Sequence, residues 1–154
     1  MSAPLFFEDF REGDVAEYGD VTVSSQDIIA FAEKFDPQPF HLDDEAAKPV
    51  SGGLIASGWH GAALMLRVNC DAFLLRAALV ESTKADPLSV EEISWIRPIR
   101  PGDRLRVRRT VLAARHTDQA GEVEFLFELV NQHGLVATRQ RSALGILRRD
   151  AGAR

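Results

Sequence analysis

The chain has 154 residues, which suits one domain of ordinary size and leaves little room for a second. It is 45% hydrophobic and 27% charged, so it can bury a core without help from disulfides or a metal. Acidic residues outnumber basic residues 23 to 18, and the net charge of -5 argues against a general nucleic-acid-binding protein, which needs a strongly basic face. We expect a single domain over residues 1–154, with an ordered core of about residues 8–148.

Cysteine content and hydropathy indicate a soluble protein of a reducing compartment. The single Cys70 can form no internal disulfide, and the sequence contains no Cys/His cluster of zinc-binding spacing. The N-terminal segment lacks the basic-then-apolar order of a signal peptide. The most apolar stretch, 61–80, is interrupted by Arg67, Asp71 and Arg76, which makes it a poor membrane span. We expect a cytoplasmic location, with no metal and no membrane association.

The first half of the chain predicts a strand followed by a capped helix. Residues 15–23 are rich in β-branched side chains, as strands are. Ser24 and Asp27 fit the capping pattern S-x-x-D ahead of a helical apolar period. That helix cannot pass Asp36, because Pro37 disfavours helical geometry at the residue before it.

The next segment, 36–53, is predicted to be irregular, apart from a short helix over Glu45–Lys48 that Asp43 and Asp44 would stabilise at its start. Its prolines and glycines are typical of a functional loop. A second helix is expected from Ser57 or Gly58 to about Val80, since apolar residues recur there at steps of three and four. Few positions on this helix are polar, so it should be buried on most sides.

The second half changes to a period of two. Residues 104–111 and 122–129 alternate between polar and apolar side chains, which predicts half-buried strands. Pro101-Gly102-Asp103 marks a turn, and His133-Gly134 fits a two-residue hairpin. The order of elements predicts an α+β fold, with one antiparallel sheet wrapped around a single apolar helix.

Asp36 and His41 form the pair that points most clearly to chemistry. They are five residues apart, and the intervening Pro37 and Pro39 forbid a continuous helix, while a strand would direct the two side chains to opposite faces. A loop that curls would bring them together. A carboxylate and a neutral imidazole facing one water can hold and activate it. Turn formation alone is the alternative explanation of this spacing.

Three blocks of the chain resemble the MaoC-like dehydratases, the (R)-specific enoyl-CoA hydratases of the hot-dog fold. The family pattern Asp-x-Asn-Pro-x-His corresponds to residues 36–41, which read Asp-Pro-Gln-Pro-Phe-His here. Residues 53–58, Gly-Leu-Ile-Ala-Ser-Gly, are similar to the family's approach to the central helix. Residues 95–103, Trp-Ile-Arg-Pro-Ile-Arg-Pro-Gly-Asp, are similar to its strand-and-turn block. The blocks occur in family order and, with the element order, cover most of the chain.

The resemblance implies a carbon-oxygen lyase of fatty acid metabolism that interconverts trans-2-enoyl-CoA and (R)-3-hydroxyacyl-CoA. Asp36 and His41 would match the catalytic pair, and the backbone N–H of Gly58 would match the donor to the thioester oxygen. A helix N-terminus suits that task, because its free donors and positive dipole end lie where enolate charge develops. The resemblance also implies a homodimer with an acyl-CoA tunnel at the subunit interface, and no cofactor apart from the coenzyme A of the substrate.

Several further residues are candidates for contact with substrate. Gln38 replaces the family's asparagine and would alter the support of the Asp36–His41 loop or mark a subgroup with another substrate. Ser57 either caps the helix or lines the site, and His60 either contacts substrate or is structural. Of seven arginines between 97 and 115, Arg97 and Arg100 are the better candidates for coenzyme A phosphate, since most of the others should form the wet face of two strands.

Two alternatives stay open at this point. One is an acyl-CoA or acyl-carrier binding protein that kept the fold and lost turnover, for which Gln38 is the main argument. The other is a hot-dog thioesterase, in which an acid on the central helix does the work. Asp71 would be that acid, although its spacing from Arg67 also fits an i,i+4 ion pair.

Overall fold

The computed structural model describes residues 2–80, 88–116 and 120–151. The expected core of 8–148 therefore includes two stretches, 81–87 and 117–119, that lie outside the described residues. In chain order the helices are a 3-10 turn (Phe7–Asp9), α1 (Ser25–Phe35), α2 (Pro39–Leu42), α3 (Asp44–Ser51), α4 (Gly58–Asn69) and a π-helical turn (Cys70–Leu74). The strands are β1 (Val15–Thr22), β2 (Leu88–Trp95), β3 (Arg104–His116), β4 (Ala120–Val130) and β5 (Val136–Leu147).

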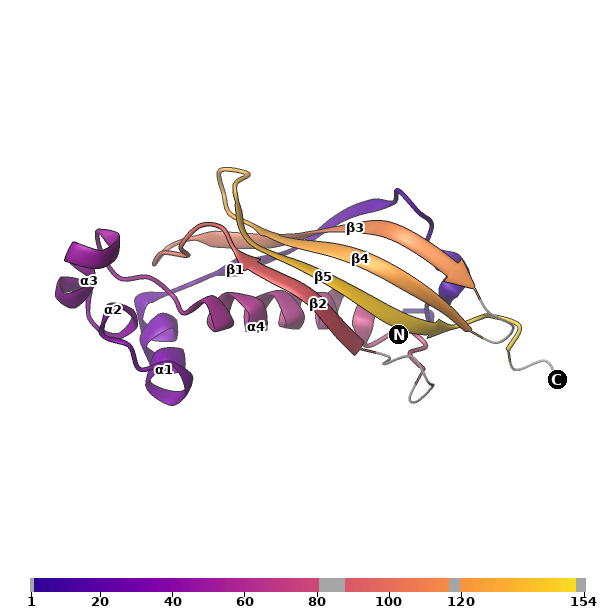
Figure 1. Ribbon diagram of the computed structural model, residues 1–154, viewed down its shortest axis with the longest axis horizontal. Coiled ribbons are helices and arrows are strands. Elements are labelled where there is room, and N and C mark those ends of the chain that lie inside the picture. The colour runs from indigo at the N-terminus through magenta and orange to yellow at the C-terminus, as the bar shows by residue number, and fades with distance from the viewer. Residues whose placement is uncertain (1, 81–87, 117–119, 152–154) are drawn as a thin grey trace.

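The five strands form one antiparallel sheet in the order β1-β3-β4-β5-β2. Figure 1 shows this sheet curving over α4, while α1, α2 and α3 gather at one end of α4. The core lies between the sheet and α4, where Met65 and Val68 of the helix face strand residues such as Val107 and Phe125. The structure confirms the α+β class and the hot-dog arrangement of a sheet wrapped around one helix.

The N-terminal elements form for the local reasons that the sequence indicates. The Ser24 side chain accepts the N–H of Asp27, and Asp27 accepts the N–H of Ser24, which completes the predicted capping box of α1. The helix ends at Phe35, as Pro37 requires. The turn at 101–103 is also confirmed, with Gly102 at a φ of 88° that favours glycine.

Residues 36–53 are more helical than predicted. Pro39 occupies the first position of α2, where a missing N–H costs nothing, and α3 extends to Ser51 with Pro49 inside it. Asp43 caps α3 by accepting the N–H of Ala46 at 2.8 Å. The short helix expected over Glu45–Lys48 is present within the longer α3, whereas the prediction of irregular structure for the rest of the segment was wrong, because a helix tolerates proline at its first position.

The central helix is shorter than predicted. α4 ends at Asn69, the π-helical turn follows, and the chain is extended before Val80. The N–H of Ala78 donates to Leu5, and the N–H of Val80 donates to Gly145. Pairing with Leu5 on one side and β5 on the other thus satisfies the backbone of a segment whose apolar spacing looks helical. The expected two-residue hairpin at His133-Gly134 is instead a five-residue loop, 131–135, closed by a bond from Asn131 N–H to Leu135 O.

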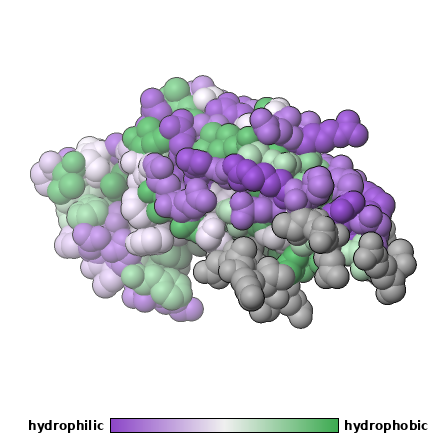
Figure 2. All heavy atoms as spheres, turned by 45° about the vertical axis from the view of Figure 1, so that its right-hand side comes forward, coloured by the Kyte–Doolittle hydropathy of each residue, from purple (hydrophilic) through white to green (hydrophobic). Residues whose placement is uncertain are grey.

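Ion pairs cover the outer face of the sheet. Glu128 is buried between Arg108 at 2.8 Å and Arg139 at 3.1 Å, and Glu124 pairs with Arg141. Figure 2 shows hydrophilic side chains over this part of the molecule. Most arginines of β3 therefore do line the wet face. Arg109 is the exception, because it points toward the core.

Polar side chains also lie on the core face of the sheet, near the C-terminal end of α4. The guanidinium of Arg109 lies 4.8 Å from the ring centroid of Phe73 and 5.9 Å from that of Tyr18. The Tyr18 hydroxyl donates to Oδ1 of Asn69 at 2.7 Å. Burial raises the pKa of Tyr18, since the phenolate would lose its hydration.

Candidate active site

The segment between α1 and α2 brings Asp36 and His41 together. The N–H of Asp36 closes the last turn of α1 on Ala32, and the N–H of His41 donates to Gln38 within the turn of α2. With the chain bent in this way, Nε2 of His41 lies 3.4 Å from Oδ2 of Asp36. The His41 side chain is 6% exposed and that of Asp36 is 18% exposed. The curl that the two prolines suggest is present.

The carbonyl of Ile55 fixes the tautomer of His41. Nδ1 lies 2.8 Å from this oxygen, and a carbonyl can only accept, so Nδ1 carries the hydrogen. In the neutral ring Nε2 then offers its lone pair toward Asp36. Two acceptors at 3.4 Å do not bond to each other directly, and a water that donates to both satisfies them. The geometry of the pair is thus compatible with a bridging water.

Ser57 and Gln38 orient the Asp36 carboxylate. The hydroxyl of Ser57 donates to Oδ2 at 2.6 Å, and Nε2 of Gln38 donates to Oδ1 at 2.7 Å. These two hydrogen bonds, the Ser57 bond foremost, hold the pKa of Asp36 below its ordinary value, and burial works against them. When its ring is protonated, His41 adds a smaller contribution that also lowers the pKa of Asp36. Gln38 therefore supports the carboxylate directly. The sequence suggested a binding role for Ser57 but gave no sign of its contact with Asp36, twenty-one positions away.

The N-terminus of α4 lies beside this pair. Ser57 caps the helix by accepting the N–H of Trp59 at 3.3 Å, while the N–H of Gly58 has no hydrogen-bond partner among the described residues. Gly58 also lines a pocket of about 220 Å³ together with Ile55, Trp95 and Arg97. A Cβ at Gly58 would lie 2.6 Å from Cδ1 of Trp95, so only glycine fits there without a shift.

The other predicted site residues are placed differently. Arg97 lines the pocket at Gly58, with one guanidinium nitrogen donating to Val136 O at 3.0 Å. Arg100 donates to Ser51 O at 2.5 Å and so braces the end of α3. The ring of His60 stacks on Phe31 at 4.7 Å and makes no hydrogen bond with Asp36 or His41. His60 therefore packs α4 against α1 in this structure, and its contact with substrate stays a prediction.

An apolar groove of about 550 Å³ runs along α4. Trp59, Ala63 and Leu66 form its helix side, and residues of β2, β4 and β5 form the other. Trp59 is exposed and meets Trp95 edge-to-face at 5.0 Å, so the two indoles stand between this groove and the pocket at Gly58. Trp59 therefore lines the surface groove and is not a core residue.

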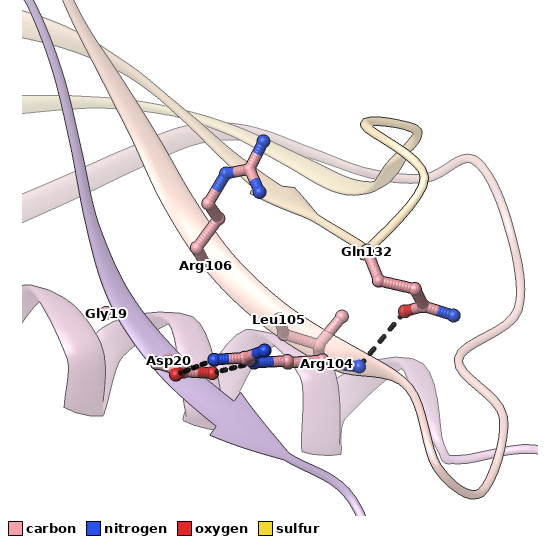
Figure 3. Close-up of a pocket in the computed structure, with 6 residues that line it drawn as sticks. All are labelled: Gly19, Asp20, Arg104, Leu105, Arg106 and Gln132. Carbon is pink, nitrogen blue, oxygen red and sulfur yellow. Dashed lines mark hydrogen bonds and ion pairs between the residues drawn. The ribbon is translucent and has the colours of Figure 1, made fainter.

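A third pocket, of about 340 Å³, lies where β1 meets β3. Figure 3 shows Arg104 against Asp20, with Gln132 bonded to the backbone of Arg104 and Arg106 pointing away from them. The guanidinium of Arg104 makes two bonds to Asp20, at 2.6 and 2.5 Å. Its charge is thus neutralised within the chain.

The described part of the chain contains no group of three or more His, Cys, Asp or Glu side chains that could hold a metal ion. Within the same residues, no helix is long and apolar enough to cross a membrane.

A hot-dog sheet with an Asp–His pair at the N-terminus of its central helix defines the class of this protein. A family model described as a MaoC like domain matches residues 10–131, and the chain belongs to that family.

Known proteins agree with this assignment. A solved structure of a MaoC-like dehydratase from Rhodospirillum rubrum is 39% identical, with a TM-score of 0.81 over 94% of this chain and 98% of that chain. The R-hydratase PhaJ1 from Pseudomonas aeruginosa shares the fold at 20% identity, with a TM-score of 0.69 over 94% of this chain and 86% of that chain. The uncharacterised protein YdeM from Bacillus subtilis (strain 168) is 30% identical over 99 residues, 64% of this chain and 67% of YdeM. The family and the Rhodospirillum structure support hydratase/dehydratase chemistry in general.

Proposed function

We propose that the protein interconverts a trans-2-enoyl-CoA and an (R)-3-hydroxyacyl-CoA by adding or removing water. The observation that carries this proposal is the 3.4 Å approach of His41 Nε2 to Asp36 Oδ2, with the opposite ring nitrogen committed to Ile55 O. This geometry leaves two acceptors that one donating water molecule can bridge. Neither acceptor needs a metal or a redox cofactor to position a water molecule.

In hydration, the held water attacks C3 of the enoyl thioester. Its oxygen forms the new C–O bond, one hydrogen leaves to the pair, and a proton is returned to C2, so the thioester stays intact. Because the pKa of Asp36 is held low, its carboxylate is a weak base, and Nε2 of His41 takes the proton. Asp36 then orients the water and stabilises the imidazolium that forms.

The backbone N–H of Gly58 is the proposed hydrogen-bond donor to the oxygen of the developing enolate. This free N–H lies at the start of α4, where the helix dipole adds positive potential, and it opens into the pocket beside Ile55. The absence of a side chain lets the bulky thioester approach the backbone. Arg97 lines the same pocket, which supports its proposed contact with a coenzyme A phosphate, whereas Arg100 donates to the carbonyl of Ser51.

A second copy of the chain is the proposed partner. β2 is at the edge of the sheet, where its backbone can pair with another strand. Val90 and Trp95 of this strand and Leu66 of α4 are exposed, which favours an apolar interface there. Val90 and Leu66 also line the groove along α4, so the second copy would cover this groove rather than fill it. Light scattering of the purified protein should therefore give twice the mass of the chain or a multiple of it.

The structure does not favour the thioesterase alternative, for which Asp71 is the candidate acid. Asp71 is exposed and forms an ion pair with Arg67 at 2.9 Å, as i,i+4 spacing allows. Neither residue lines any of the three pockets described here. An acid that performs hydrolysis needs to reach the thioester carbonyl.

The test is the loss of ultraviolet absorbance of the conjugated thioester when crotonyl-CoA is mixed with the protein, with free thiol measured in parallel. We expect loss without thiol release, and its reduction by at least about a hundredfold in Asp36→Asn and His41→Ala. Asp71→Asn is the matched control, and it should retain activity. No loss with crotonyl-CoA or with longer and branched enoyl-CoAs would favour the binding protein, and thiol release would favour the thioesterase.

A further inference from the structure

Asn69 is a buried polar residue that the proposed reaction does not use. It ends α4, is 3% exposed and lines the apolar groove. Its Oδ1 accepts the Tyr18 hydroxyl at 2.7 Å, which fixes the orientation of the amide. Its Nδ2 donates to no residue in the described part of the chain. Because Asn69 lines the groove, a ligand that fills the groove and excludes water from it either supplies an acceptor or leaves this nitrogen unpaired, which costs free energy.

The groove leads from the reaction centre to this donor. Trp59, Ala63, Leu66 and Asn69 succeed one another along one side of α4 at steps of four, three and three, so the groove follows the helix axis. Gly58 stands at the start of the helix, beside Trp59. A chain attached to a thioester at Gly58 therefore has a continuous apolar path once it passes the two indoles.

Other polar groups in the groove are less suited to bind a ligand. Nε2 of Gln140 donates to Oγ of Ser142 at 2.7 Å, so those two satisfy each other. Ser89 lies on the opposite wall, on β2. Asn69 thus offers a donor that has no partner among the described residues and is held in a fixed direction at the groove.

We propose that the groove receives an acyl chain carrying an oxygen acceptor, such as a ketone or hydroxyl, and that the Asn69 amide selects it. This inference rests on the proposed function, which locates the thioester at Gly58. Asn69 lies eleven residues beyond Gly58, about 16 Å along the helix, and its side chain leans back toward the N-terminus. An extended chain covers about 1.2 Å per bond, so the oxygen belongs roughly ten to thirteen bonds from the thioester carbon.

The size of the groove suits this substrate. At about 30 Å³ per water-sized group, 550 Å³ holds on the order of eighteen such groups, more than a chain of a dozen atoms needs. A purely saturated chain would fill the same volume but leave Nδ2 unpaired and cut off from water. The oxygenated chain removes that penalty, which is the source of the discrimination.

Calorimetric titration with saturated acyl-CoAs tests the inference without requiring turnover. One ligand is a plain chain of about fourteen carbons, and the others replace one methylene by a ketone at successive positions over roughly the last five. We expect one ketone position to bind about tenfold more tightly than the plain chain. Equal affinity of the plain chain and every ketone, or no binding of any of them, would overturn the inference.

Variants assign the effect to Asn69. Asn69→Leu should remove the preference, and the double variant Tyr18→Phe/Asn69→Leu should do the same while leaving no buried hydroxyl unpaired, which guards against misfolding. Ser89→Ala is the matched control: retention of the preference supports Asn69, and its loss would transfer the role to Ser89 and refute the assignment. Hydration of crotonyl-CoA by the unaltered protein is measured separately, so failure of the proposed reaction is distinguished from failure of the inference.

Discussion

The hydroxyl of Ser57 donates to Oδ2 of Asp36 at 2.6 Å, and Oγ of the same hydroxyl accepts the N–H of Trp59 at 3.3 Å. One side chain thus caps the central helix and orients the carboxylate of the reacting pair. Because the hydroxyl has a single hydrogen and lone pairs to spare, the two roles are compatible. The Asp36 carboxylate is thereby tied to the helix end that carries Gly58.

Ser57→Ala should lower kcat, whereas a mutation that removes only a helix cap should lower stability alone. Ser57 caps α4 and Ser24 caps α1, and loss of either cap costs about 1 kcal/mol of unfolding free energy. Ser24→Ala is therefore the matched control, because Ser24 caps a helix without contacting Asp36 or His41. We expect similar stability losses in urea but a kcat at least about tenfold lower only in Ser57→Ala. Equal kcat in the two variants would contradict the orienting role.

Gln38→Leu should raise the pKa of Asp36. The Ser57 and Gln38 hydrogen bonds favour the charged carboxylate, so removing the second of them makes protonation easier. A depressed pKa contributes stability above the unfolded value near 3.9 that is lost as pH falls through the folded value. The variant should therefore be less stable than the unaltered protein at neutral pH, and the difference should shrink at acid pH.

A carbon NMR titration of the aspartate carboxyls measures this change directly. Gln132→Leu provides the control, because its amide donates to Asp103 at 3.0 Å in a similar pair elsewhere. The Asp36 titration should move to higher pH in Gln38→Leu and stay in place in Gln132→Leu. An unmoved Asp36 titration in Gln38→Leu would show that the amide contributes nothing to the carboxylate.

Tyr18→Phe tests the buried hydrogen bond that fixes Asn69. Removing the hydroxyl leaves Oδ1 of Asn69 unpaired, at a cost of about 1–3 kcal/mol of unfolding free energy at neutral pH. Burial raises the pKa of Tyr18 above the unfolded value near 10, so its contribution is present below that pH and is lost as pH rises further. The stability gap between the two proteins in urea should therefore narrow in strongly alkaline solution, and a constant gap would contradict the burial of the hydroxyl.

The sequence predicts the Asp36–His41 pair because prolines restrict the path between two residues that are close along the chain. It does not predict Ile55 O or Ser57 Oγ as their partners, since both contacts depend on how α2 packs against the segment before α4. The end of α4 was missed for a related reason. Apolar spacing continues past Asn69, but Leu5 and Ile146 offer strand-like pairing there, and periodicity carries no information about such distant segments.

Asn69 and Arg109 show the same limit inside the sheet. The alternation over 104–111 predicts the core face correctly, and Arg109 falls on that face although its type suggests solvent. Aromatic rings from the N-terminal segment, β1 and the π-helical turn surround it, and their approach is a property of the whole fold. Likewise, the donor that Asn69 presents to the groove exists because Tyr18 of β1 occupies its oxygen.

Gly58→Ala should reduce activity far more than stability. A methyl group at this position meets the indole of Trp95, which is half exposed and can move aside, and alanine also favours the helix by about 1 kcal/mol over glycine. The same methyl group stands beside the N–H that would bind the thioester oxygen, and loss of one such donor costs roughly a hundredfold or more in kcat. The double variant Gly58→Ala/Trp95→Ala removes the steric conflict. If kcat/KM for crotonyl-CoA stays low in both variants, the N–H of Gly58 is the group that matters; if the double variant recovers, displacement of Trp95 explains the loss and the oxyanion role is wrong.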